Sequence, residues 1–268
     1  MHTTSVNPTA SLTQAFVAGA AVGVLGGLIG LGGAEFRLPL LIGLFGFAAL
    51  SAVILNKAMS LIVVASALLF RMGTVPVEQL IDHWQIIVNL LAGSVLGAWW
   101  GAALATRAQP RTLYRVMAAL LVVIAVALVL HPLLHDGGTP LLGGGAQIVV
   151  GLLAGFGIGV VASLLGVAGG ELLIPTIVLL YGIDIKTAGS LSLAVSLPTM
   201  IAGFARYSRD GSFRVLRQQR RFVLVMAAGS VAGVALGAAL LGVVPGALLL
   251  PALALILVVS AWRVWRHG

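Results

Sequence analysis

Four charged side chains lie within apolar stretches of the chain, and their types suggest chemistry on an anion and a proton. They are Glu35, Arg37, Lys57 and Glu171. Charge is costly inside an apolar stretch, so each is a candidate functional residue. Arg37 and Lys57 are suited to attract an anion, whereas an ionised Glu35 or Glu171 would repel it. Two nearby carboxylates favour protonation of one of them, so we predict that this pair couples proton binding to anion binding.

Neutral hydrogen-bonding side chains accompany Lys57 on its own segment and on the equivalent segment of the second half. They are Asn56, Ser60, Ser192 and Ser196. We predict that they help to bind the substrate, because their donors can replace the hydration shell of an oxyanion. Two structural explanations stay open. Lys57 could extend to a membrane interface, and Glu35 with Arg37 could form a local pair at a bend.

A glycine-rich turn precedes each of the two glutamates, with the sequences GLGGAE and GVAGGE. Glycine permits a turn that leaves backbone N–H groups free, and the helix that follows directs its positive N-terminal end at them. We predict that Gly32, Gly33, Gly169 and Gly170 bind the anion where two broken helical hairpins meet within the membrane. The alternative is a pair of tight surface loops between ordinary helices.

The chain is an internal duplication. GVLGGLIGLGGAEFRLP from Gly23 is matched from Gly159 by GVVASLLGVAGGELLIP, an offset of 159 − 23 = 136 residues. The same offset later aligns GSVLG with GSVAG. The chain has only seven acidic residues, so a matched glutamate inside a shared glycine and proline frame is not a chance event. We predict two repeats, 1–135 and 136–268, with five membrane segments in each.

The composition identifies an integral membrane protein. Apolar residues make up 60% and charged residues 8% of the 268 residues, against roughly 45–50% and about 25% in soluble domains. The mean hydropathy is +1.14. So few charges could not cover a soluble surface, which excludes soluble enzymes and nucleic-acid-binding proteins despite the net charge of +8. There are no cysteines, so disulfides and thiolate metal sites are excluded as well.

Apolar runs bounded by charge or proline predict the membrane segments. In the first repeat these are 15–31, 38–50, 52–70, 84–105 and 114–130, and in the second 147–167, 172–182, 188–205, 222–241 and 247–264. The second run of each set is too short to cross a core of ~30 Å upright, which takes about 20 residues. A unit with an odd number of segments is copied upside down. We therefore predict an all-α polytopic protein of two inverted repeats with broken or re-entrant hairpins, an arrangement typical of secondary transporters.

The positions of Lys and Arg predict the orientation. Eleven of the twelve in loops and tails fall in 106–115, 206–221 and the C-terminal tail, and Arg71 is the exception. Cytoplasmic loops carry the excess of basic residues. We therefore predict a multi-pass protein of the cell inner membrane with both termini in the cytoplasm.

The glycine motif with its following proline opens each half, and in this the chain resembles the TauE/SafE family, the toluene-sulfonate uptake permeases. The matching residues are Gly30, Gly32, Gly33, Pro39, Gly166, Gly169, Gly170 and Pro175. The resemblance implies a membrane exporter of sulfite, a sulfonate or a related oxyanion. Ala34 and Ala168 replace glycines that the family leads one to expect, and both motif glutamates stand where the family usually has an apolar residue.

Two alternatives to this function stay open, namely an anion channel and a carrier of a non-sulfur organic anion. We do not expect an enzyme, because the five histidines lie in tails or at loop margins, away from a serine or an acidic cluster. We expect no cofactor, no metal and no nucleic acid. The predicted partners are a small anion and the lipid bilayer, and a homodimer is left open.

Overall fold

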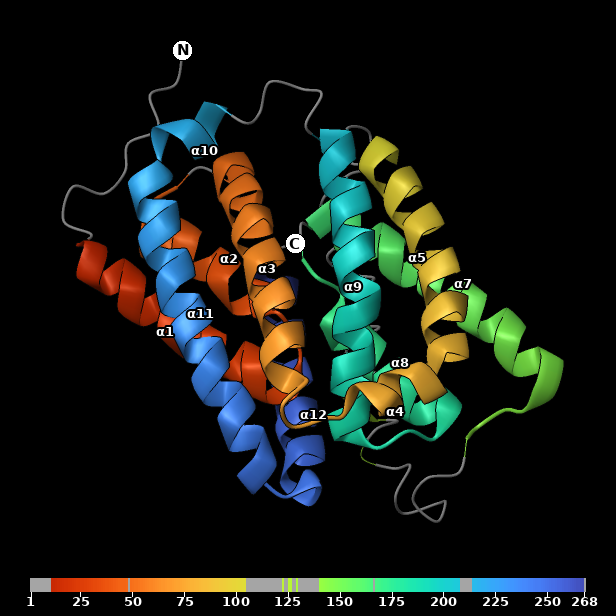
Figure 1. Cartoon of the computed structure of the whole chain (residues 1–268). Helices are drawn as coiled ribbons and strands as arrows, with labels where there is room; N and C mark the ends of the chain where they lie inside the picture. Colours follow the sequence, from red (N-terminus) through yellow and green to blue (C-terminus); the bar gives the residue numbers. More distant parts are fainter. Residues whose placement is uncertain are drawn as a thin grey trace.

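The computed structural model describes residues 11–47, 49–104, 122, 125–126, 129, 140–165, 167–207 and 214–267. All regular structure in this part of the chain is helical (Figure 1). The helices are α1 (Leu12–Ile29), α2 (Ala34–Gly43), α3 (Ala49–Arg71), α4 (Val77–Asp82), α5 (Trp84–Leu104), α7 (Gly144–Leu165), α8 (Gly170–Tyr181), α9 (Ile185–Tyr207), α10 (Arg214–Gln218), α11 (Arg220–Val243) and α12 (Gly246–His267). The predicted segment 114–130 lies outside the described residues except at four positions.

Five stretches of these helices are long and apolar enough to cross a membrane. They are Leu12–Ile29, Ile54–Arg71, Gly144–Ser163, Ile185–Ala205 and Arg220–Val243. By contrast, α2 has 10 residues and α8 has 12. With a rise of about 1.5 Å per residue, neither can cross a hydrocarbon core of ~30 Å. The second segment of each half is therefore short, as predicted, and its re-entrant placement stays a prediction.

The boundary between the second and third segments was predicted wrongly. The sequence favoured one run over 38–50, whereas α2 ends at Gly43 and α3 begins at Ala49. The chain turns between them at Gly46, which has a φ of +69°. Phe45 and Phe47 in this turn are buried. An apolar run does not reveal where a helix ends when the turn that ends it is itself part of the core.

The helices form two packed bodies, and each body takes helices from both halves of the sequence. In the first body α1 packs along α11, and α2, α3 and α10 join them. In the second body α7 packs along α5, and α8, α9 and α4 join them. The packing of α1 on α11 and of α2 on α3 in the first body corresponds to the packing of α7 on α5 and of α8 on α9 in the second, when 136 is added to or subtracted from the residue numbers. The two bodies meet along α3 and α9, which are equivalent helices side by side in Figure 1.

Glycines allow the long helices of each body to touch backbone to backbone. A Cβ at Gly97 of α5 would overlap the carbonyl oxygen of Phe156 on α7, and a Cβ at Gly233 of α11 would overlap that of Ala20 on α1. These two contacts differ by 136 residues at both ends. The same holds for the neighbouring glycines at 93, 101, 229 and 237. Small residues at such interfaces maximise van der Waals contact where the surrounding lipid offers no hydrophobic drive.

The positions of the short helices confirm that the repeats are inverted. Helices α4 and α10 occupy equivalent places in the two halves, yet they lie at opposite ends of the molecule (Figure 1). Between them α3 and α9 run in opposite directions, since α3 leads toward α4 and α9 leads toward α10. The end of the molecule that carries α4 is called the α4 end below, and the opposite end is called the α10 end.

Polar and apolar side chains are distributed as expected for a protein surrounded by lipid. Large apolar side chains such as Leu153 and Trp100 are exposed on the outer surface, at 66% and 62%. Among the described side chains, four charged ones are instead buried, namely Arg37, Lys57, Arg71 and Glu171. A soluble protein almost never buries these residue types fully unless they are paired. The buried charges therefore define the region in which to look for a site.

Candidate functional site

The predicted helix break is present in both halves and depends on glycines with positive φ. Gly33, with φ +69°, stands directly before α2, and Gly169, with φ +80°, stands directly before α8. Residues with a Cβ rarely adopt this conformation. Neither glycine offers a side chain that could cap the helix after it. The first backbone N–H groups of α2 and α8 are therefore not satisfied by N-cap side chains.

The two turns lie against each other where the bodies meet. A Cβ at Gly32 would be 3.1 Å from the Cβ of Ala168, and a Cβ at Gly170 would be 3.0 Å from the Cα of Leu31. Each turn thus occupies space that a larger side chain on the other would need. The structure brings together the glycines that the sequence singled out, from segments more than a hundred residues apart.

Arg37 is tied to α3 by a buried network within the first body. Its Nη1 donates to Ser60 Oγ at 2.9 Å and to Asn56 Oδ1 at 3.4 Å. Asn56 Nδ2 in turn donates to the carbonyl oxygen of Ala34, in the first turn of α2, at 3.0 Å. Three predicted substrate ligands therefore contact one another and fix the start of α2 on α3.

Lys57 is directed to a different place, across the boundary between the bodies. It lies one residue after Asn56 on α3, and its side chain is 4% exposed. A Cβ at Gly203 of α9 would be 3.1 Å from Lys57 Nζ and 3.6 Å from the Oγ of Ser163 on α7. The amino group from the first body is thus surrounded by helices of the second. This burial between helices argues against extension of Lys57 to a membrane interface.

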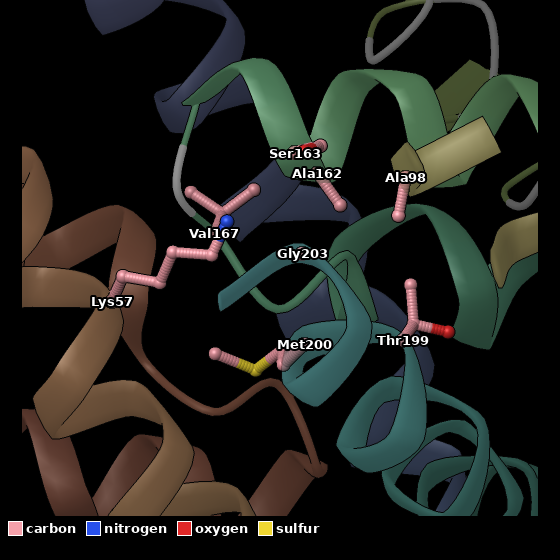
Figure 2. A pocket seen from close by; sticks show the side chains of 8 residues that line it. All are labelled: Lys57, Ala98, Ala162, Ser163, Val167, Thr199, Met200 and Gly203. Carbon is pink, nitrogen blue, oxygen red and sulfur yellow. The ribbon is translucent and has the colours of Figure 1, made fainter. Parts of the chain in front are cut away.

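A small cavity surrounds the end of the Lys57 side chain (Figure 2). Its other lining residues come from α5, α7, α9 and the second glycine turn: Ala98, Ala162, Ser163, Val167, Thr199, Met200 and Gly203. The hydroxyls of Ser163 and Thr199 are its polar wall opposite the amino group. About 10 Å³ is open to the centre of a water molecule, close to the minimum that holds one water. The cavity is therefore too small for a sulfur oxyanion without rearrangement.

The two serines predicted on α9 occupy different environments. Ser192 Oγ lies 3.1 Å from the carbonyl oxygen of Gly30 and 2.8 Å from that of Gly189, so it bonds the first glycine turn to α9. Ser196 is 1% exposed, and its Oγ has no hydrogen-bond partner among the described residues. Neither serine lines the Lys57 cavity.

The two motif glutamates can be placed to different extents. Glu171 is buried in the first turn of α8, next to the point where Gly170 meets the first glycine turn. The backbone of Glu35 lies in the first turn of α2, and its side chain lies outside what the structure describes. The coupling of these carboxylates to a proton stays a prediction.

Two groups of functional interest were missed by the sequence analysis. Ser94 on α5 and Thr199 on α9 join their hydroxyls at 2.6 Å beside the cavity. Arg71 was counted as a loop residue, yet it is 1% exposed and bonded on all sides. One signal could have found it, because Arg71 is the single basic residue that violates the predicted orientation. Its burial removes that exception.

The described residues contain no group of three or more His, Cys, Asp or Glu that could hold a metal ion. What they contain is a pair of glycine turns, buried cations and hydroxyls at the boundary between two inverted bodies. Sites of this kind, with broken helices near the repeat interface, are typical of secondary transporters.

The fold and the site define a polytopic, all-helical membrane protein built from two inverted repeats. The family model described as "Sulfite exporter TauE/SafE" matches residues 2–128 and again 142–268. The chain belongs to this family. No curated protein and no solved structure matches the chain.

Proposed function

We propose that the protein is a secondary transporter that exports a small sulfur-containing anion, such as sulfite or a sulfonate. The observation that carries the proposal is the buried amino group of Lys57, which shares a small cavity between the two bodies with the hydroxyls of Ser163 and Thr199. A cation with neutral donors around it provides what a partly desolvated oxyanion needs. Family membership supports the choice of a sulfur oxyanion.

The proposed direction follows from the membrane potential. Moving one negative charge out of a negative interior releases roughly 2.3 kcal/mol per 100 mV. Export of an anion therefore needs no further energy source, whereas uptake would need a coupled proton or cation. Glu171 is the buried carboxylate best placed to link a proton to the cycle, since it starts α8 directly after the second glycine turn.

We also propose that the α10 end faces the cytoplasm. Arg217, Arg220 and Arg221 are exposed there, while Glu78 and Asp82 are exposed on α4 at the other end. This agrees with the excess of basic residues on cytoplasmic surfaces. In this orientation, α4 lies on the non-cytoplasmic side of the cell inner membrane.

A carrier is favoured over a channel because the cavity around Lys57 is too small to let an oxyanion pass. A carrier admits its substrate by rearranging, whereas an open pore would need a continuous passage. Counterflow with the membrane potential clamped at zero separates the two, since only a carrier then accumulates labelled anion in exchange for unlabelled anion that leaves the vesicle.

The test is a flux and binding screen of sulfite, thiosulfate, sulfonates and carboxylates on protein reconstituted in liposomes. We expect saturable, outwardly directed flux of at least one sulfur oxyanion. Lys57→Met should weaken its binding at least about tenfold, given that a hydrogen bond to a charged group contributes about 1.5–3 kcal/mol. Arg220→Met is the control, because it removes one exposed cation outside the cavity. Undiminished binding in Lys57→Met would place the anion elsewhere.

A further inference from the structure

Arg71 makes a dense set of contacts that the proposed anion site does not use. Its guanidinium lies at the α4 end of α3 and is almost fully buried. Nη1 donates to the carbonyl oxygens of Gly27 at 2.8 Å and Leu28 at 3.0 Å, both in the last turn of α1. The last carbonyls of a helix have no partner within the helix and carry its negative dipole end. Arg71 therefore caps α1 directly before the first glycine turn.

The same guanidinium also bonds the second body. Nη2 donates to the carbonyl oxygen of Lys186 at 2.6 Å, and Nε donates to Ser190 Oγ at 3.0 Å, both in the first turns of α9. The carboxylate of Asp184, which accepts hydrogen bonds from the first backbone N–H groups of α9, adds an electrostatic attraction. One side chain thus connects the end of α1 with the start of α9.

A glycine on α9 leaves room for the Arg71 guanidinium. A Cβ at Gly189 of α9 would be 2.6 Å from Arg71 Nη2 and 2.5 Å from the carbonyl oxygen of Ile29. Only a glycine leaves room there for both the guanidinium and the end of α1. Ser192, less than one turn further along α9, bonds the carbonyl oxygen of Gly30. The first glycine turn is thereby held to the second body through adjacent contacts.

Arg71 is the last residue of α3, whereas Lys57 lies in the first half of the same helix. They are 71 − 57 = 14 positions apart on α3, which corresponds to about 21 Å along the helix axis. The Lys57 cavity is bounded by Gly203 and Met200 near the α10 end of α9. The contacts of Arg71 therefore close the boundary between the bodies on the far side of the cavity, toward the α4 end.

We infer that Arg71 is a positioning residue that latches the two bodies together at the α4 end, and that releasing this latch opens the Lys57 cavity toward that face. The inference rests on the proposed function, because a carrier must open its site to each side in turn. The latch exists in one copy, since the position equivalent to Arg71 in the second half is Tyr207. The two gates of the cycle are therefore chemically different.

The natural absence of cysteine provides a direct test. Ser163→Cys places a single thiol on the cavity wall. A charged, membrane-impermeant methanethiosulfonate reagent is then added from each side of the membrane, and the rate of labelling is measured. Single cysteines at the exposed positions Gln79 on α4 and Gln218 on α10 identify which side is which. With Arg71 present, we expect slow labelling of the cavity from the α4 side.

Arg71→Met in this background should raise labelling from the α4 side at least about tenfold, since it removes several hydrogen bonds of a charged group. Labelling from the α10 side should stay unchanged. Arg217→Met, which removes an exposed cation on α10, is the matched control and should alter neither rate. An unchanged rate from the α4 side, or an equal rise from both sides, would overturn the latch and leave Arg71 with a purely structural role.

Milder variants keep the test decisive if Arg71→Met fails to fold. Ser190→Ala removes one bond of the latch, and Arg71→Lys keeps the charge but has too few donors for all the acceptors. Each should raise labelling from the α4 side alone, by less than Arg71→Met. The labelling readout needs no substrate. If Arg71→Met raises labelling from the α4 side but the protein transports no tested anion, the result contradicts the proposed function and supports the latch.

Discussion

Helices α3 and α9 are equivalent by the duplication and face each other at the centre of the molecule, yet they carry different chemistry. Lys57 on α3 corresponds to Leu193 on α9, and Arg71 corresponds to Tyr207. Leu193 is buried in an apolar cluster with Val64 of α3. The cations therefore lie on one side of the pseudo-twofold axis. The duplicated frame supplies two glycine turns, whereas the buried cations supply one proposed anion site and one proposed latch.

Unlike the buried cations, the glycine contacts between the long helices are present in both halves. Each long helix pair uses equivalent glycine positions, and at each of them a side chain would overlap the equivalent backbone carbonyl of the partner helix. Symmetry in packing and asymmetry in charge can be separated experimentally. Substitutions of the glycines where the long helices touch should have matched effects in the two halves, whereas substitutions of buried charge should not.

The largest expected effect comes from placing a side chain at the glycines where two long helices touch backbone to backbone. Gly97→Leu and Gly233→Leu each place a side chain where the partner helix has its backbone, at Phe156 and Ala20. Overpacking of this kind costs up to about 3 kcal/mol and occasionally more, and backbone cannot move aside as a side chain can. We expect both variants to lose most of the folded protein in detergent, to a similar degree, as measured by monodisperse yield and thermal unfolding.

Gly157→Leu on α7 is the matched control for both variants. Nothing lies within 4 Å of a Cβ at that position, and the residue is exposed. This variant should fold with normal yield. If only one of Gly97→Leu and Gly233→Leu lost its fold, the packing would be less symmetric than the backbone indicates.

The next effect concerns the two turns. Gly33→Ala and Gly169→Ala each place a Cβ in the left-handed region, which costs roughly 1–2 kcal/mol. At Gly33 the new Cβ would also be 2.5 Å from a methyl of Val22 and 2.9 Å from its carbonyl oxygen, whereas at Gly169 the nearest atom is 3.2 Å away. We therefore expect the melting temperature to fall further in Gly33→Ala than in Gly169→Ala. Equal losses would mean that the first turn relaxes around the methyl group.

The sequence predicted much of the frame because the frame is periodic. The duplication, the glycine turns and the small-residue spacing all repeat at 136 residues, and apolar length predicts a span without knowledge of its neighbours. The burial of Lys57 and Glu171 followed from their apolar surroundings in the same way. These features depend on the local chain, which is what a single sequence records.

The direction of each side chain could not be predicted on this basis. Arg37 and Lys57 looked alike in sequence, but Arg37 turns to Ser60 within its own body while Lys57 crosses to the other. Arg71 ended an apolar run and resembled a loop residue, because its acceptors are backbone carbonyls of α1 and α9. Carbonyl acceptors carry no sequence signal, and Ser163 and Thr199 join Lys57 only through packing of the two bodies.

The smallest expected effect tests whether the two motif glutamates, like the buried cations, contribute unequally from the two halves of the chain. Glu171 is buried beside the contact of the two turns, and when ionised it would repel an anion held between the bodies. Anion binding should therefore favour its protonated form, and flux should rise as pH falls. Glu171→Gln is a permanent neutral mimic of that form. It should leave anion affinity intact and flatten the profile of flux against pH in proteoliposomes.

Glu78→Gln, on the exposed surface of α4, controls for the loss of one carboxylate and should keep the wild-type slope. A profile in Glu171→Gln as steep as that of the wild type would assign the proton to another group, with Glu35→Gln as the variant to measure next. Flattening by Glu171→Gln alone would show that the proton, like the anion, uses one half of a duplicated frame.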